Sequence, residues 1–165
     1  MNRPILWATL AVLSVAVIWT LVPGRSQPAG APKVPVAGRV LVNGKPAAGV
    51  TVRFQSDDGE LAGQDRQPVA TTDDQGNFQL SSHGNADGAA PGNYVVTFFW
   101  PTNPIKADKD RLRGRFMNAA QSRFKVSIGQ DTALPPFELE IPEAMLLPAD
   151  EAATKNSSAL PPPPP

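Results

Sequence analysis

The only histidine, His83, is the first candidate for acid–base chemistry in this chain. It lies in the segment Ser81-Ser82-His83-Gly84, and Asp87 follows four residues later. Serine, histidine and a carboxylate are the components of a nucleophilic triad. No serine lies in the G-x-S-x-G turn that exposes the nucleophile of α/β-hydrolases. We therefore interpret His83 as a solvated loop residue and predict no catalytic residues.

Two acidic turns raise the alternative of a metal site. Asp73-Asp74-Gln75-Gly76-Asn77 begins like a calcium-binding loop, and Asp57-Asp58-Gly59-Glu60 is similar. An EF-hand loop supplies oxygen ligands through its twelfth position, a bidentate glutamate that neither segment provides. The absence of cysteine excludes zinc–thiolate sites and disulfides. We interpret both segments as turns between strands and predict no metal and no cofactor.

A third segment is basic. Seven Lys or Arg residues and two Asp residues lie between 106 and 125, although the whole chain carries 15 basic and 15 acidic residues. In an extended conformation, Arg111, Arg113 and Arg115 would project to one side, where guanidinium groups bind carboxylates or phosphates. The alternative is that this connection covers a sheet edge and pairs its charges locally. If the domain binds a partner by charge, we expect these three arginines to contact it.

The partner expected at this surface is an anionic envelope polymer or a protein. The zero formal net charge of the chain argues against a nucleic-acid partner.

The candidate residues above must be positioned by strands. Short apolar runs separated by Gly, Pro and Asp predict where these strands lie. Alternation in Val50 to Gln55 predicts that Val50, Val52 and Phe54 face inward and that Arg53 faces outward. Asn43-Gly44 predicts a hairpin, with a loop that extends to Gly49. The seven predicted strands are 36–42, 50–55, 69–72, 78–80, 94–100, 124–128 and 137–141. This pattern predicts an all-β fold, a seven-stranded Greek-key β-sandwich, with room for one short helix in 105–121.

The N-terminus, residues 1–24, has the pattern of a membrane segment. Residues 5–22 are uncharged, and as a helix they would span ~27 Å, close to the roughly 30 Å hydrocarbon core of a bilayer. Trp7 and Trp19 lie near its ends, where indole rings favour the membrane interface. A cleaved signal peptide is the alternative, although its apolar stretch is usually shorter.

Two Pro-rich segments flank the predicted domain. Residues 25–35 read as a Pro/Gly linker, and residues 143–165 read as a disordered tail that ends in five prolines. The β-sandwich is therefore expected at 36–142, which is long enough for one hydrophobic core.

The chain contains several short motifs whose order matches a known pattern. They are Val36-Ala37-Gly38-Arg39-Val40, Asn43-Gly44-Lys45-Pro46, Gly49-Val50-Thr51-Val52-Arg53-Phe54, Thr72-Asp73-Asp74-Gln75-Gly76-Asn77-Phe78, Gly88-Ala89-Ala90-Pro91-Gly92-Asn93-Tyr94 and Leu134-Pro135-Pro136-Phe137-Glu138-Leu139. Over residues 36–141 the chain resembles the carboxypeptidase regulatory-like domains, in particular their small exported bacterial type. The resemblance implies a transthyretin-like (prealbumin-like) sandwich and an accessory, non-catalytic role. Many of those proteins carry a lipid-anchor cysteine, which this chain lacks.

Enzymes with related folds do not fit the composition. Transthyretin-like hydroxyisourate hydrolases use several histidines, and intradiol dioxygenases need two histidines and two tyrosines for iron, whereas this chain has one of each. We expect a non-catalytic extracytoplasmic binding or cell-envelope structural module, tethered to the membrane through residues 5–22. The alternatives are an accessory or regulatory subunit of an envelope enzyme and, dependent on His83, a hydrolase. We expect the domain in the periplasm or at the cell surface, or secreted if the N-terminal segment is cleaved.

Overall fold

The structure is a computed structural model, and it describes residues 32–57, 59, 61–130 and 133–150. The predicted membrane segment, residues 5–22, and the Pro-rich residues 151–165 lie outside the described residues. Within the described part, no helix combines the length and apolarity needed to cross a membrane.

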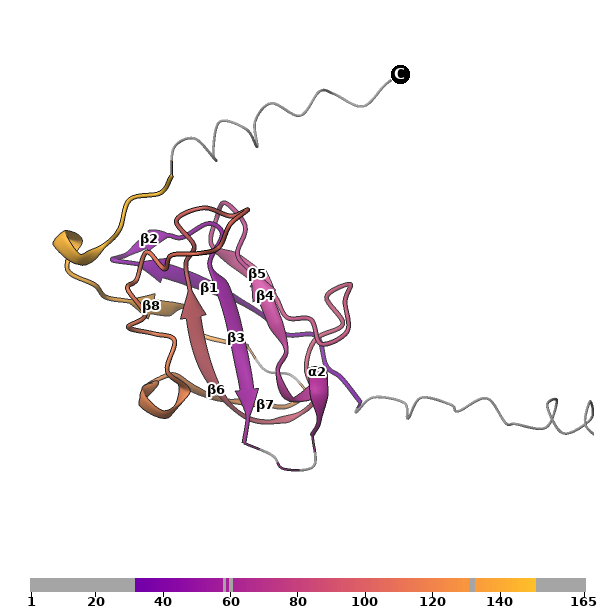
Figure 1. Cartoon of the computed structure of the whole chain (residues 1–165). Coiled ribbons are helices and arrows are strands. Elements are labelled where there is room, and N and C mark those ends of the chain that lie inside the picture. The colour runs from indigo at the N-terminus through magenta and orange to yellow at the C-terminus, as the bar shows by residue number, and fades with distance from the viewer. Residues whose placement is uncertain (1–31, 58, 60, 131–132, 151–165) are drawn as a thin grey trace, which may run out of the picture. The chain divides into compact units, whose positions relative to one another are not determined.

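Strands are the commonest regular structure among the described residues, where helix is limited to three short turns (Figure 1). The strands are β1 (Ala37–Val42), β2 (Lys45–Pro46), β3 (Thr51–Ser56), β4 (Val69–Thr71), β5 (Asn77–Gln79), β6 (Gly92–Phe99), β7 (Lys125–Ile128) and β8 (Phe137–Leu139). The helical turns are α2 (Gly63–Arg66), η2 (Ala119–Gln121) and η3 (Glu143–Met145). The helix allowed for in 105–121 is thus a single 3₁₀ turn, η2.

The strands form two four-stranded sheets. One has the order β4-β3-β6-β7, and its neighbouring strands are all antiparallel. In the other, β1 pairs with β2 and β5 in antiparallel fashion and with β8 in parallel. The prediction of an all-β, two-sheet architecture is confirmed.

The hairpin after β1 is tighter than the sequence analysis predicts. Asn43 and Gly44 both have positive φ, at 51° and 75°, so these two residues alone close the turn. Lys45 then pairs with Val42, and Pro46 pairs with Leu41, which makes β2 an eighth strand. Pro46 is tolerated because β2 is an edge strand, where a missing N–H breaks no ladder.

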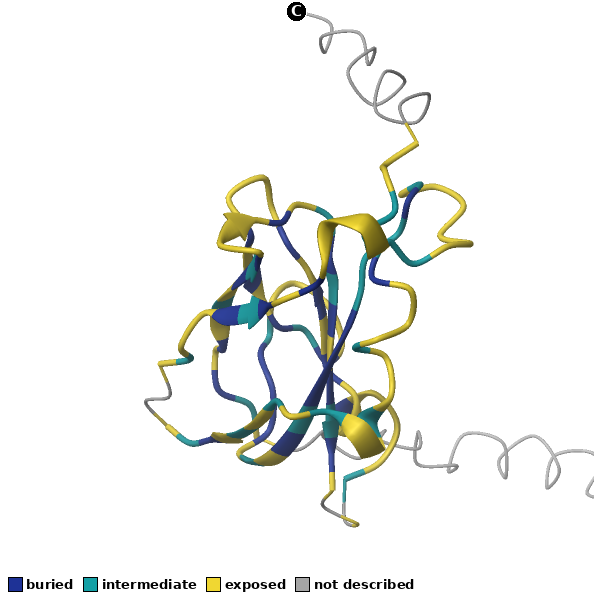
Figure 2. Ribbon diagram, turned by 90° about the vertical axis from the view of Figure 1, so that its left-hand side faces the viewer, coloured by how far each residue is buried: buried dark blue, intermediate teal, exposed yellow. Residues whose placement is uncertain are grey.

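Aromatic rings fill the space between the sheets. The Phe98 and Phe137 ring centroids lie 5.4 Å apart, and those of Phe54 and Tyr94 lie 6.0 Å apart. Buried residues therefore line the inner faces of the sheets, while exposed residues gather on the outer faces and loops (Figure 2). The predicted core residues are Phe54, Phe78, Tyr94, Val96, Phe98, Val126 and Leu139. Six of these residues belong to one buried cluster, and Val126 is partly buried against that cluster.

The register of β3 is as predicted. Val52 and Phe54 are fully buried, and Arg53 between them is exposed. Thr97 pairs with Arg53 on the outer face of the same sheet, but it is buried rather than solvated. It lines a hollow on that face together with Ala107 and Met117, because the connection between β6 and β7 lies over the sheet there.

Phe98 lies at the centre of the core, so we expect Phe98→Ala to lower the free energy of unfolding by about 3–5 kcal/mol. Chemical denaturation of the full-length chain measures this. Ile105 is 78% exposed, and as the matched control Ile105→Ala should change stability by less than about 0.5 kcal/mol. Equal effects of the two substitutions would contradict the described core.

Candidate functional site

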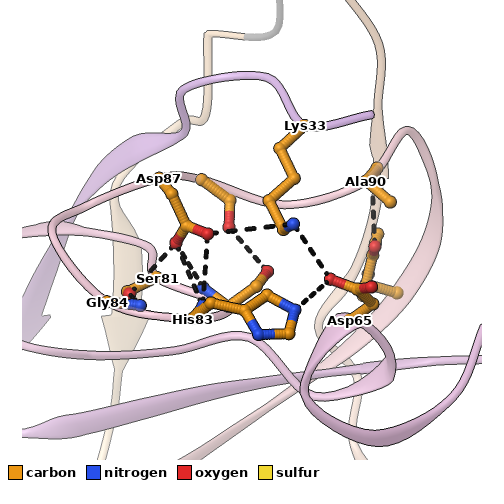
Figure 3. Close-up of polar contacts among 10 residues, drawn as sticks. Lys33, Asp65, Ser81, His83, Gly84, Asp87 and Ala90 are labelled. Atoms are coloured by element: carbon orange, nitrogen blue, oxygen red, sulfur yellow. Dashed lines mark hydrogen bonds and ion pairs between the residues drawn. The ribbon is translucent and has the colours of Figure 1, made fainter. Parts of the chain in front are cut away.

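Polar side chains from three segments meet where the described chain begins (Figure 3). Lys33 precedes Val34, whose backbone bridges to Ala89 beside the start of β6. Asp65 comes from α2, and His83 and Asp87 come from the loop between β5 and β6. We call Lys33, Asp65, His83 and Asp87 the Lys33 cluster.

The Lys33 ammonium links two carboxylates in this cluster. Its Nζ atom lies 3.2 Å from an Asp65 oxygen and 3.8 Å from an Asp87 oxygen. His83 Nε2 lies 2.9 Å from the same Asp65 oxygen. The Lys33 and Asp65 side chains are only 16% and 13% exposed, so water screens this pair less than a surface ion pair.

The Asp87 carboxylate organises the loop that carries His83. It accepts hydrogen bonds from the N–H groups of Ser82 (2.8 Å) and His83 (3.2 Å), and from the Ser81 hydroxyl (3.1 Å). Burial alone would raise the pKa of Asp87, but these hydrogen bonds and the charge of Lys33 outweigh it, so the pKa lies below its ordinary value. Asp87 is therefore ionised throughout the neutral range.

This geometry does not assemble a nucleophilic triad. The His83 ring contacts Asp65, while the Ser81 hydroxyl donates to Asp87 and accepts from the Gly84 N–H. A base that activates a serine must lie within hydrogen-bond reach of the hydroxyl. The cluster instead connects Lys33, near the start of the described chain, to α2 and to the loop between β5 and β6.

The acidic turn at Asp73 is also structural. The Asp73 carboxylate accepts the N–H groups of Gln75 (2.9 Å) and Asn77 (2.8 Å), and the bond from Asn77 is the main cause of its lowered pKa. Gly76 has φ 77°, and a Cβ there would lie 2.5 Å from the Val40 carbonyl oxygen. Among the described residues, no group of three or more His, Cys, Asp or Glu residues is placed to hold a metal ion.

Asp110 shapes the segment that carries the three predicted arginines. Its carboxylate accepts the N–H groups of Trp100 (2.9 Å), Leu112 (3.1 Å) and Gly114 (2.7 Å). Arg113 and Gly114 have positive φ, at 53° and 74°. The segment is therefore a succession of turns, and the extended conformation assumed for Arg111, Arg113 and Arg115 is wrong.

The three arginines nevertheless reach one target, the segment after β8. Arg111 Nε donates to the Leu147 carbonyl (2.9 Å), and Arg113 Nε donates to the Met145 carbonyl (2.7 Å). Arg115 Nη1 lies 3.8 Å from the Met145 sulfur. Residues 143–150, which the sequence analysis assigns to the Pro-rich tail, are therefore held against the domain.

Arg111 differs from its two neighbours in burial. Its guanidinium carbon lies 3.7 Å above the Trp100 ring, and burial lowers its pKa. A guanidinium remains charged at neutral pH even so. Arg113 and Arg115 are exposed.

The basic segment lacks acidic partners among the described residues. No Lys or Arg between 106 and 125 forms an ion pair with a described carboxylate. The ion pairs of the described residues join Lys33 or His83 to Asp65 or Asp87. The alternative interpretation of this segment supposed that its charges pair locally. Such pairing with carboxylates is not found among the described residues. The surface keeps a local excess of positive charge.

The same segment also covers the free edge of β6. Beyond β7, the Phe98 N–H donates to the Phe116 carbonyl (2.9 Å) and the Val96 N–H donates to the Phe124 carbonyl (2.8 Å). Phe116 is partly buried against the core, whereas Met117 is 51% exposed. The edge-covering part of the alternative interpretation is thus observed, whereas a binding role of the same segment stays a prediction.

Sequence reasoning missed Lys33 and Asp65. Lys33 lies at the end of a Pro/Gly-rich stretch and Asp65 lies in a polar loop, and neither position follows an apolar pattern. Only the loop residues His83 and Asp87 carried a recognisable signal.

For the Lys33 cluster, we expect Asp87→Ala to lower the free energy of unfolding at pH 7 by about 1–3 kcal/mol, because partly buried N–H groups lose their acceptor. The pKa of Asp87 is depressed in the folded state, so its contribution is present above the ordinary value of 3.8 and is lost as pH falls through the folded pKa. The difference between wild type and variant should thus be constant from pH 7 to about pH 5 and narrow below pH 4.

Urea denaturation at several pH values measures this difference. Asp74→Ala removes an exposed carboxylate and should leave stability nearly unchanged. A wild-type advantage that persists at pH 2 would refute the role given to the Asp87 charge.

Comparison with known proteins finds a similarity over part of the chain. The chain is 37% identical over 60 residues to transthyretin-like protein 5 of Caenorhabditis elegans, and the match covers 36% of this chain and 40% of that relative. No family model matches the chain, and no solved structure matches it. The chain is thus similar over part of its length to a transthyretin-like protein, and its two-sheet, strand-rich architecture fits a transthyretin-like domain.

Proposed function

We propose that this protein is a non-catalytic binding module, tethered to the membrane through residues 5–22, that presents a basic surface to an anionic envelope partner. The main support for this proposal is that Arg113 and Arg115 are exposed and have no carboxylate partner among the described residues. Within this proposal, the domain is of the small exported bacterial carboxypeptidase regulatory-like type. The domain then lies in the periplasm or at the cell surface.

The positions of the Lys33 cluster and of the three arginines support a tethered role. The Lys33 cluster lies beside the start of β6, and Arg111 lies beside its end. Eight strand residues separate these ends, which corresponds to ~26 Å. The indigo start and the yellow end of the described chain likewise lie on opposite sides of the domain (Figure 1). A tether that enters at Lys33 therefore leaves the arginines at the far end.

The arginines can bind a further group because their carbonyl contacts use few donors. Each guanidinium has five N–H donors, and the contacts of Arg111 and Arg113 with the segment after β8 use Nε only. The terminal nitrogens of Arg113 remain for a carboxylate or phosphate, which a guanidinium binds through two parallel hydrogen bonds.

An accessory subunit of an envelope enzyme is the second candidate. It uses the same basic surface, but its partner is an acidic protein rather than a polymer. Co-purification from detergent-solubilised membranes distinguishes the two, because a stoichiometric enzyme in the eluate favours the accessory role.

The tether predicts that the full-length protein fractionates with membranes. Because residues 5–22 are uncharged over a bilayer-spanning length, carbonate washing should leave the chain in the pellet, with Met1 or Asn2 at its N-terminus. N-terminal sequencing of both fractions checks this. Recovery of a soluble chain that starts near Pro32 would replace the tether with a cleaved signal.

The basic surface predicts salt-dependent retention on an anionic polymer. With the double substitution Arg113→Gln and Arg115→Gln, retention on a polyphosphate or polyuronate column at low salt should fall at least about tenfold. The free energy of unfolding should stay within about 0.5 kcal/mol of the wild-type value, because both side chains are exposed. Arg111→Gln should lower stability more than either substitution, because it removes the stacking on Trp100 and the bond to Leu147.

Lys45→Gln serves as the matched control, since it removes an exposed cation outside the basic segment. Unchanged retention of the double variant would contradict the proposal and leave the segment purely structural.

A further inference from the structure

A second basic feature includes Arg115 together with Arg123. A hollow of about 310 Å³ opens between the segment before β7 and the residue after β8. Its lining residues are Arg115, Phe116, Gln121, Ser122, Arg123, Phe124 and Glu140. This volume is at the lower end of the range for small-molecule sites. We call it the Arg123 hollow.

The Arg123 guanidinium is held in place at this hollow. Its Nη2 donates to the Glu138 carbonyl oxygen (3.3 Å), and its central carbon lies 5.1 Å from the Phe124 ring centroid. A guanidinium that is fixed before binding loses less conformational entropy when it captures a ligand. The aromatic rings of Phe116 and Phe124 supply an apolar wall, as both are partly buried against the core.

The charges of the hollow are of both signs. Arg115 and Arg123 supply two cations, and Glu140 supplies an exposed carboxylate. No ion pair of the described residues joins Arg115 or Arg123 to Glu140. The charged nitrogens of both arginines therefore lie more than 4.0 Å from the Glu140 oxygens. The lining therefore offers separate attraction for a negative and a positive group.

From this arrangement we propose that the Arg123 hollow binds a small zwitterion that carries both a carboxylate and an ammonium group, namely an α-amino acid or a short peptide. The two arginines bind the carboxylate, and Glu140 binds the ammonium. Glu140 disfavours a phosphate, because a dianion beside a carboxylate is repelled and phosphate has no positive group to offset this. The inference rests on the proposed binding role of the basic segment and names a ligand class for it.

Binding is measured on the full-length chain in a neutral detergent, through the Nε–H resonances of Arg115 and Arg123. The probes are alanyl-alanine, its C-terminal amide, its N-acetyl form and inorganic phosphate. Alanyl-alanine should bind tightest, and each of the other three should bind about tenfold more weakly, because each lacks one charged group or carries the wrong charge. Equal binding of alanyl-alanine and its two blocked forms, or tighter binding of phosphate, would overturn the proposal.

Three variants test the assigned roles. Arg123→Gln should weaken alanyl-alanine about tenfold, and Lys106→Gln, which removes an exposed cation outside the hollow, should not. Glu140→Gln should bind the N-acetyl form more tightly than alanyl-alanine, a reversal that misfolding cannot produce. No reversal in Glu140→Gln overturns the zwitterion assignment. If the wild-type chain binds no alanyl-alanine while its retention on the anionic polymer is intact, this inference is refuted and the proposed function stands.

Discussion

The backbone of β6 has two edges that need hydrogen-bond partners, and the rest of the domain follows from how they are supplied. β3 pairs along one edge from Tyr94 to Phe99. On the other edge β7 pairs only as far as Val95. An open edge beside the most hydrophobic strand would expose unpaired N–H groups and invite pairing with other chains. The connection between β6 and β7 covers this edge, with bonds from Phe98 to Phe116 and from Val96 to Phe124.

The basic surface is a consequence of that covering. To return along β6, the connection folds into turns that Asp110 holds through three N–H groups, and Leu112 is buried in the core. Arg113 and Arg115 in these turns face solvent, whereas Arg111 is partly buried against Trp100. The arginines bind the carbonyl groups of 145–147, so residues 143–150 join the domain through main-chain contacts. One segment therefore covers a sheet edge and binds the C-terminal part of the described chain. It also exposes cations that have no carboxylate partner among the described residues.

The strands were predictable because their side chains alternate or form continuous apolar runs between turn residues, as in 50–55 and 94–100. The Lys33 cluster was not, because it joins three polar segments that only the folded chain brings together. The ordered residues 143–150 were not predictable either, since they contribute backbone carbonyls, which any sequence has. The turn at Asp110 did carry a signal in Asp110 and Gly114, a carboxylate followed by a residue suited to positive φ. The regular spacing of Arg111, Arg113 and Arg115 suggested an extended conformation instead.

The central claim, that the β6–β7 connection completes the edge of β6, is tested most directly by native-state hydrogen exchange of the Val96 and Phe98 amides. If the connection acts as the missing strand, both amides should exchange only through global unfolding, as slowly as the slowest amides of the β3–β6 ladder. Their protection should then fall in parallel with global stability as denaturant is added. Exchange of Val96 and Phe98 that is at least about a hundredfold faster and insensitive to denaturant would mean that the connection opens locally. That result would contradict the account.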